Sequence, residues 1–245
     1  MLAHWKHGVH RGSVAYVLMT MTYILRLWMP DRPGALGQVA SRVGAVGGDV
    51  VGIDILERGA GRAIDELVVS LPGPELVDLL VQELREVDGV DVEDIRPVAD
   101  GVPDSRLDAL ETAALLVEQA SASALLETLV RHACHDLEAS WAAVVDLDGP
   151  AVLASRGSAP LATWLGAFVS GSQASMELGG DGAIIDDVAW APFPHADLAM
   201  VLGRQGRPFR ARERRQLAAL TRIADWRWAE LVVRTARSIH PSTAV

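Results

Sequence analysis

Hydrophobic and polar residues follow two different periods near the start of the chain. Across residues 22–29 they alternate, which is typical of a β-strand with one buried face. Across residues 36–46 apolar side chains recur three and four positions apart, which predicts a helix. We expect this helix to have Pro33 as its first residue and Asp31 as its N-cap, and to end at the glycine pair that begins with Gly47.

The same patterns predict four more elements. Residues 50–57 and 63–71 have strand patterns, joined by a glycine-containing hairpin turn. A second helix begins at Pro74, and residues 90–98 form a short strand. The order strand, helix, strand, strand, helix, strand predicts a ferredoxin-like α+β domain over residues 21–99.

A second α+β domain is predicted over residues 107–237. A polar linker, residues 100–106, separates it from the first domain, within a stretch at residues 97–108 that contains two prolines and a glycine. An antiparallel sheet is expected at its centre with helices at its two ends, residues 170–175 as a loop, and residues 238–245 as a flexible tail. The expected helices are residues 107–119, 122–138, 160–170 and 211–237, and the expected strands are residues 140–147, 150–156, 183–191 and 196–204.

Charge and composition narrow the range of partners. The 245-residue chain carries a formal charge of -10, which argues against a nucleic-acid backbone or an anionic membrane as partner. Cys134 is the single cysteine, which excludes an internal disulfide and favours a cytoplasmic protein. Residues 1–20 place basic residues ahead of an apolar run, but Arg26 interrupts that run and no cleavage site follows. We expect a disordered or extended leader there.

The turn between the first strand and the first helix is the most informative motif. A dinucleotide-binding turn at this place needs G-x-G-x-x-G, whereas Asp31-Arg32-Pro33-Gly34 supplies one glycine, and the chain has no P-loop motif. Nucleotide binding is therefore not expected. Backbone N–H groups at a helix start instead suit a small anionic or zwitterionic ligand, which Gly34 and the small Ala35 allow to come close.

These residues carry a resemblance to the ACT domain family, over about residues 22–99, in the stretch MPDRPGALGQVASRVGAVGGDVVGIDI and the hairpin and helix that follow it. The resemblance implies that the domain pairs with a second ACT unit and binds an amino acid or related metabolite at their interface. Members that bind amino acids often have asparagine where this chain has Asp49. By position, the ligand-binding residues would be Asp31, Arg32, Pro33, Gly34, Ala35 and Leu36 in the turn, and Gly48, Asp49 and Val50 in a second segment supplied by the partner subunit.

The second domain resembles a GAF domain through its architecture and through the entry into its last helix, RPFRARERRQLAALTRIAD at residues 207–225. This resemblance implies a ligand pocket over the sheet or a helical dimer surface, and it assigns no pocket residue. No cysteine stands where a linked chromophore would need one, so no cofactor is expected.

Other candidate motifs have a structural interpretation. His132 and His135 can share a helical face as metal ligands, but no third ligand accompanies them, so a solvated face without a metal is expected. Asp186 and Asp187 are neighbours in a strand pattern and would point to opposite faces. A serine hydrolase is not indicated, because G-x-S-x-G is absent.

The last helix carries aromatic and basic residues. Trp226 and Trp228 face different directions, so core packing or a dimer contact is expected rather than an aromatic cage. Four arginines near the helix start are interpreted as a solvated face that can meet an acidic partner and lacks the aromatic residues of a nucleic-acid site. They are Arg210, Arg212, Arg214 and Arg215.

Together these observations predict a non-catalytic regulatory homodimer, in which a ligand at the ACT domain changes the dimer geometry and the GAF-like domain relays that change. Two alternatives stay open. One is a constitutive dimerisation scaffold whose turn holds no ligand. The other is an enzyme that uses His132, His135 or Asp186 of the C-terminal domain.

Overall fold

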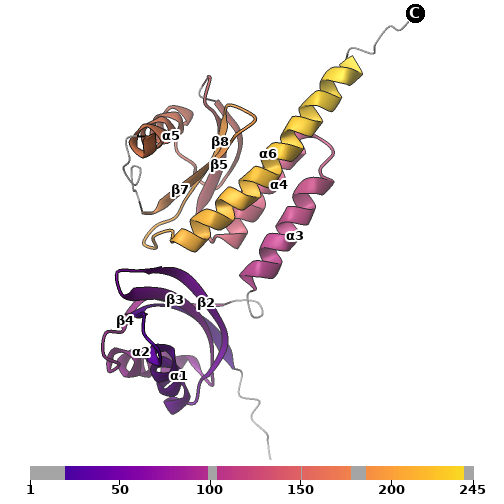
Figure 1. The fold of residues 1–245 in the computed structure, drawn as a ribbon. Coiled ribbons are helices and arrows are strands. Elements are labelled where there is room, and N and C mark those ends of the chain that lie inside the picture. Colours follow the sequence, from indigo (N-terminus) through magenta and orange to yellow (C-terminus); the bar gives the residue numbers. More distant parts are fainter. Residues whose placement is uncertain (1–19, 99–103, 150, 178–185, 240–245) are drawn as a thin grey trace, which may run out of the picture.

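The chain folds into two α+β units, each built on one antiparallel sheet. The computed structural model describes residues 20–98, 104–149, 151–177 and 186–239; the expected leader up to residue 19, most of the expected linker and the end of the expected tail lie outside them. The two four-stranded sheets have the orders β2-β3-β1-β4 and β6-β5-β8-β7. Figure 1 shows the units one above the other. The predicted α+β class with two antiparallel sheets is confirmed.

The first unit has the predicted βαββαβ order. Helices α1 and α2 lie on the face of its sheet that is turned away from the second unit (Figure 1). Its elements are β1 (Met21–Pro30), α1 (Ala35–Ala45), β2 (Asp49–Gly59), β3 (Arg62–Leu71), a 3-10 turn (Pro74–Leu76), α2 (Val77–Arg85) and β4 (Asp91–Pro97).

The alternation in β1 places every second side chain under the helices. Leu25 and Leu27 are fully buried there, beside Leu67 of the neighbouring strand β3. Val39 of α1 and Leu80 of α2 close this core from above, and they are fully buried too. We call this side of the sheet the helix face, and the opposite side the domain face, because the second unit covers it.

Glycines shape the ends of two elements in the first unit. Ala60 and Gly61, with φ of 51° and 76°, form the two-residue turn that joins β2 to β3. Gly47, with φ of 76°, ends α1, and the next N–H, that of Gly48, donates to Val43 O at 3.0 Å. Both features were predicted from the glycine positions.

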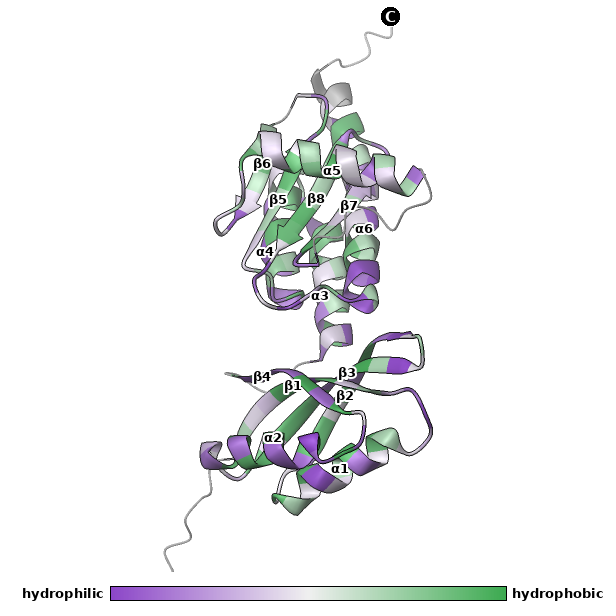
Figure 2. Cartoon of the chain, turned by 90° about the vertical axis from the view of Figure 1, so that its left-hand side faces the viewer, coloured by the Kyte–Doolittle hydropathy of each residue, from purple (hydrophilic) through white to green (hydrophobic). Residues whose placement is uncertain are grey.

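The second unit has helices on both faces of its sheet. Helices α3, α4 and α6 lie on one face and α5 on the other (Figure 1), and each face has its own apolar core. Figure 2 shows these apolar strands between the helices. The elements are α3 (Ser105–Glu118), α4 (Ala122–Asp136), β5 (Trp141–Asp146), β6 (Ala151–Arg156), α5 (Ala162–Glu177), β7 (Val188–Phe193), β8 (Leu198–Gly203) and α6 (Ala211–Ile239).

In the second unit two stretches differ from the prediction, and α6 runs on to Ile239, two residues into the segment expected as a tail. Helix α3 begins at Ser105, inside the segment expected as linker, because the Asp104 carboxylate accepts the N–H groups of Arg106 and Leu107, both at 3.1 Å. The expected loop at residues 170–175 is wrong, since this stretch is part of α5. Ser172 is buried there, so packing outweighs the weak helix propensity of its serines and glycine.

Candidate functional site

The turn after β1 is held by backbone contacts. The N–H of Asp31 donates to Gly61 O at 2.9 Å, which fixes the turn against the β2–β3 hairpin. Gly34 then adopts a left-handed conformation, with φ of 88° and ψ of -13°, as the N-cap of α1. The prediction that Asp31 caps the helix and that Pro33 opens it is wrong. The left-handed Gly34 redirects the chain, so that the helix begins at Ala35 without a side-chain cap.

The predicted turn residues present mostly backbone and charge to solvent. Asp31, Arg32, Pro33 and Gly34 are exposed, whereas Ala35 is buried and Leu36 packs partly against the core. In the first turn of α1, the N–H groups of Leu36 and Gly37 have no hydrogen-bond partner within the described part of the chain. The turn therefore offers unpaired donors and the positive end of a helix to a small anion.

Gly34 is required by the backbone and leaves space in front of it. A Cβ added there would meet no atom within 4 Å, but its φ of 88° disfavours any other residue. A valine at this position would strain the turn of the chain itself, so a test of ligand binding needs a different variant.

The second predicted segment lies at the other end of α1. Asp49 pairs with Ser70 of β3, at the end of the sheet opposite to the hairpin that holds the turn. Helix α1 separates the two segments by roughly 16 Å, from its 1.5 Å rise per residue. Asp49 is exposed and Val50 is half-buried. One chain alone therefore does not bring the two segments together.

Gly48 has a packing role in this segment. A Cβ at this position would lie 2.8 Å from Cδ2 of Leu71 and 3.0 Å from Cγ1 of Val43. Any larger residue would push apart α1 and β3. This glycine is therefore needed by the fold, whether or not a ligand is present.

Strand β2 forms an apolar edge of the first sheet. It pairs only with β3 among the described strands, so its other edge is open. Val51, Ile53 and Ile55 along it are exposed, although they are large and hydrophobic. An open strand edge with apolar side chains is suited to pairing with another strand.

A buried arginine marks the centre of the domain face. Arg26 is 1% exposed; its Nε and Nη2 donate to Glu66 at 3.1 and 2.9 Å, and its Nη1 donates to Pro208 O at 3.0 Å. Its Nη2 also donates to Glu213 of α6 at 3.3 Å. Burial alone would lower the pKa of Arg26, but Glu213 and Glu66 outweigh it and raise the pKa. The arginine is therefore a fixed positive charge between the two units.

Glu213 gathers the contacts from the second unit. Its carboxylate accepts Nη2 of Arg204 at 2.7 Å and the backbone N–H of Arg210 at 2.8 Å, besides its contact with Arg26. Arg204 also donates to Leu137 O at 2.8 Å and lies 3.9 Å from the centre of the Phe209 ring. The loop from β8 to α6 and the first turn of α6 thus form one bonded group around the carboxylate.

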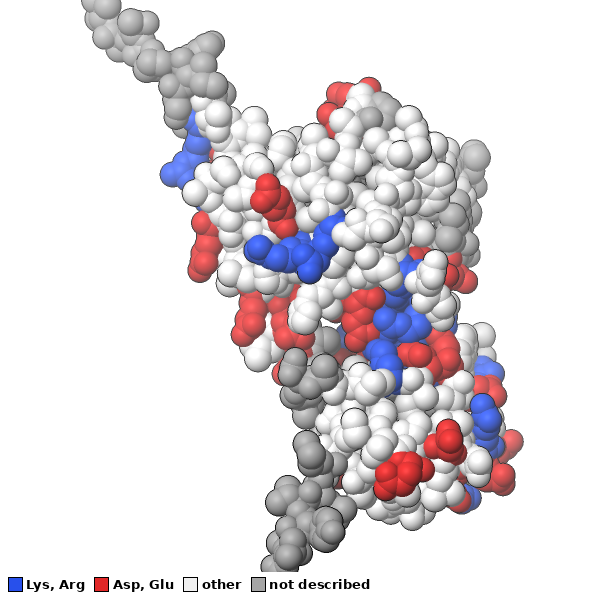
Figure 3. Space-filling view, turned by 180° about the vertical axis from the view of Figure 1, so that it is seen from behind, with Lys and Arg blue, Asp and Glu red and all other residues white. Residues whose placement is uncertain are grey.

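Further ion pairs surround this centre. Figure 3 shows the charged side chains collected where the two units meet. Glu93 of β4 accepts Nε1 of Trp28 at 2.6 Å and Nη2 of Arg210 at 2.5 Å. The remaining pairs that cross the junction include Arg96 with Glu138 at 2.7 Å, Arg212 with Asp54, and Arg207 with Asp94 at 4.0 Å.

The expectation of a solvated arginine face at the start of α6 is wrong for Arg210 and Arg212. Their side chains are largely buried against acids of the first unit. The acidic partner that these arginines can meet is therefore in the same chain. Sequence reasoning missed this cluster of ion pairs because Arg26 lies on the side of its strand that looked solvent-facing. The available signal was a single arginine among apolar strand residues.

The residues proposed for an enzyme alternative form no metal site. Burial lowers the pKa of His132, with smaller contributions from Arg131 and His135. Within the described ranges no group of three or more potential metal ligands occurs. Asp186 lies in a turn, where its backbone oxygen accepts the N–H of Phe209 at 2.7 Å.

An Asp–His contact that the sequence did not reveal fixes the turn between β7 and β8. Asp225 of α6 is fully buried and accepts the backbone N–H of His195 at 3.0 Å. Nδ1 of His195 lies 2.6 Å from the other oxygen of this carboxylate. Trp226 covers the imidazole and is itself largely exposed, while Trp228 packs against the core as predicted.

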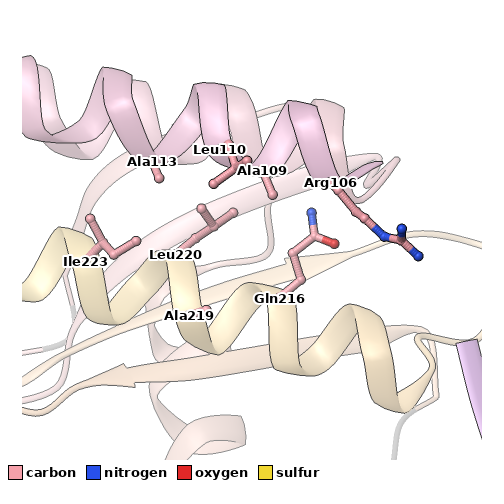
Figure 4. A pocket seen from close by; sticks show the side chains of 8 residues that line it. All are labelled: Arg106, Ala109, Leu110, Ala113, Gln216, Ala219, Leu220 and Ile223. Atoms are coloured by element: carbon pink, nitrogen blue, oxygen red, sulfur yellow. The ribbon is translucent and has the colours of Figure 1, made fainter. Parts of the chain in front are cut away.

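A shallow apolar groove lies between α3 and α6. Figure 4 shows Leu110 and Ala113 of α3 facing Leu220 and Ile223 of α6. The hollow measures about 400 Å³ and its lining is almost entirely apolar. Arg106 in its lining lies 3.6 Å from Asp54 of β2, the carboxylate that also pairs with Arg212, so the groove adjoins the ion pairs of the domain face.

A comparison with protein-family models identifies the family of the first unit. Residues 23–89, from β1 to just after α2, match the family model of the ACT domain. The N-terminal unit is an ACT domain. No curated protein matches the chain. Among the described residues, no helix combines the length and apolar character needed to cross a bilayer.

Solved structures resemble parts of this chain at low sequence identity. An uncharacterized protein from Thermotoga maritima is 24% identical, covers 32% of this chain and 98% of its own, and has a TM-score of 0.27. The ACT domain of a GTP pyrophosphokinase from Chlorobium tepidum is 15% identical, with 35% and 93% covered and a TM-score of 0.27. The GAF domain of a phosphoenolpyruvate-protein phosphotransferase from Acinetobacter is 14% identical, with 54% and 97% covered and a TM-score of 0.39.

Proposed function

We propose that this chain is a non-catalytic regulatory protein of the cytoplasm, whose ACT domains pair and bind an amino acid or a related zwitterion. The observation that carries the proposal is the turn after β1. It belongs to an ACT domain, presents unpaired N–H groups at the start of α1, and has open space in front of Gly34. The free Cys134 and the negative net charge fit a cytoplasmic protein that does not bind nucleic acid.

Pairing through β2 would complete the pocket. The end of β2 at Gly59 lies beside the turn, because Gly59 pairs with Arg62 and the adjoining Gly61 bonds to Asp31. In an antiparallel pair of β2 strands, the start of one strand lies beside the end of the other. The second copy's Gly48, Asp49 and Val50 would then approach the turn of the first copy. The same pairing would cover the exposed Val51, Ile53 and Ile55.

Strand β1 connects this pocket to the second unit. The turn follows its last residue, Pro30, and Arg26 lies four positions earlier on the same strand. Arg26 binds Glu213, so a change in β1 on ligand binding reaches the first turn of α6 directly. Regulation requires that the ligand bind one geometry more tightly than another.

Ligand-dependent unfolding tests the proposal. Thermal unfolding midpoints would be measured with each of the twenty amino acids, together with the molecular mass in solution. We expect a dimer whose midpoint rises with one amino acid or a few related ones. Ile53→Arg, at an exposed edge position, should give a folded monomer that has lost this response, because the second half of the pocket is absent.

Leu79→Arg is the matched control for Ile53→Arg. The two native side chains are 44% and 42% exposed, and Leu79 lies on α2, away from β2. This variant should keep both the dimer and the response. If no amino acid raises the wild-type midpoint while the protein remains a dimer, the constitutive scaffold is the correct function. If Ile53→Arg remains a responsive dimer, the pairing through β2 is wrong.

A further inference from the structure

One buried carboxylate in the ACT domain has an oxygen without a partner. Asp65 of β3 is 5% exposed, and its Oδ1 has no hydrogen-bond partner among the described residues. In the sheet it lies between Leu27 of β1 and Ile55 of β2. A buried acceptor without a donor destabilises a fold, so it is retained only where something offsets the cost.

Asp65 lies on the helix face, near the turn after β1. It shares this face with Ala63 and Leu67, which are two positions away on either side and both belong to the core under α1 and α2. The β2–β3 hairpin, in which Gly61 O accepts the N–H of Asp31, lies at the end of the sheet that is near Asp65. Asp65 is thus beneath the start of α1 rather than beneath its end.

The charges near Asp65 leave it without a bonded cation. Burial raises the pKa of its carboxyl group; Arg58 opposes the increase and Asp31 adds to it. Arg58 is directed to Asp31, with 3.8 Å between Nε and Oδ1, and forms no hydrogen bond with Asp65. A further cation beside Asp65 would therefore stabilise its charged form.

We propose that Asp65 receives the ammonium group of the zwitterionic ligand, while the N–H groups of Leu36 and Gly37 receive its carboxylate. This inference rests on the proposed function and names the chemistry by which the same site selects its ligand. The unpaired donors at the start of α1 and the unpaired acceptor on β3 form a matched pair of opposite character. A zwitterion pairs with the donors and with the acceptor at once, whereas a simple anion pairs with the donors alone.

The inference predicts a preference for amines over their hydroxyl analogues. A 2-hydroxy acid keeps the carboxylate of the matching amino acid but has no cationic group for Asp65. A site built around a charged hydrogen bond discriminates strongly against a ligand that leaves the buried group unpaired. The wild-type protein should therefore bind the amino acid and not its 2-hydroxy counterpart.

The experiment compares Asp65→Asn with the wild-type protein, using the stabilising amino acid from the panel of twenty and its 2-hydroxy acid. Binding to the full-length protein is measured by calorimetry at neutral pH. Asp65→Asn should fold, with an unfolding midpoint without ligand at least equal to that of the wild type, because an unpaired buried charge is removed. Its affinity for the amino acid should fall by roughly tenfold or more, and its preference over the hydroxy acid should disappear.

Asp78→Asn is the matched control, since it makes the same change of charge at an exposed position on α2. It should keep the wild-type affinity and preference. If Asp65→Asn also keeps them, the role of Asp65 is overturned while the proposed function stands. If wild type binds the hydroxy acid as tightly as the amino acid, the role of Asp65 is again overturned. If no amino acid binds to the wild type at all, the proposed function fails and this inference fails with it.

Discussion

The two faces of the ACT sheet are covered by different kinds of contact, although the same strands supply both. On the helix face, Leu25 and Leu27 of β1 pack into a continuous apolar core. On the domain face, the residue between them, Arg26, is buried against two carboxylates and one backbone oxygen. Neighbouring positions of one strand thus hold the domain together and dock it to its neighbour.

This difference determines how each face tolerates change. An apolar core gains free energy in proportion to buried area and loses it gradually as groups are removed. A buried ionic cluster is close to neutral when complete and costly when one partner is missing. Ile24, Ile64 and Val68 are also buried on the domain face, beside these ion pairs. The docking of the two units therefore combines apolar burial with a cluster of charges that must match.

The largest expected effect is on the helix face. Leu67→Ala should reduce the free energy of unfolding by about 4 kcal/mol, from lost burial and from the cavity left under α1. Urea denaturation followed by circular dichroism measures this change. Because Leu67 and Glu213 lie on opposite sides of the sheet and share no partner, the effects of Leu67→Ala and Glu213→Gln should add. A strong coupling between them would contradict the separation of the two faces.

A somewhat smaller effect is expected at the centre of the domain face. Arg26→Met should cost about 3 kcal/mol, since it leaves buried carboxylates with fewer cations. The cost is moderated because Arg96 still pairs with Glu66 at 3.4 Å and Arg204 with Glu213. In contrast to Leu67→Ala, Arg26→Met should be clearly non-additive with Glu213→Gln in the same denaturation measurements. If the effects of Arg26→Met and Glu213→Gln simply add, the two residues are not energetically coupled.

The smallest of the three effects concerns pH and the rim of the domain face. Burial would raise the pKa of Glu138, but Arg96 and Arg207 more than offset it, so the pKa is lowered in the folded protein. The resulting stability is present above the pKa of the unfolded chain and is lost as the pH falls through the folded pKa. Glu138→Gln should cost about 1 kcal/mol at pH 7, after allowance for solvent screening of this partly exposed group.

The difference between wild type and Glu138→Gln should disappear in acid, where the native carboxylate is protonated. Urea denaturation at a series of pH values between 7 and 3 follows it. Glu118→Gln at an exposed position on α3 gives a control outside the ionic cluster of the domain face. A constant difference at every pH would show that Glu138 acts by shape and not by charge.

The sequence predicted the helix face well and the domain face poorly, for a physical reason. The helix face is an apolar core, so the spacing of Leu25, Leu27 and Val39 is enough to predict which side of each element is buried. Arg26 and Glu213 are 187 positions apart, and periodicity within one element does not report such a partner. The start of α1 shows the same limit, because the left-handed Gly34, and not Asp31 or Pro33, sets its first turn.

Asp65 illustrates what a sequence can suggest but not resolve. It interrupts an apolar strand pattern, as Arg26 does, and both side chains are buried. The structure separates the two cases, since Arg26 has several bonded partners while Oδ1 of Asp65 has none among the described residues. A charged residue in a strand pattern is therefore a reason to look for a partner, and the partner can be a ligand.

The length of α6 gives the junction a mechanical property. Its 29 residues span roughly 44 Å at 1.5 Å per residue, and its first turn contains Glu213, which is bound to the ACT domain. In Figure 1 the opposite end of the helix extends beyond the sheet of the second unit. A displacement of the ACT sheet at Glu213 therefore acts on one end of this helix. A rigid tilt of the helix by about 5° about its first turn would displace the far end by about 4 Å over this length.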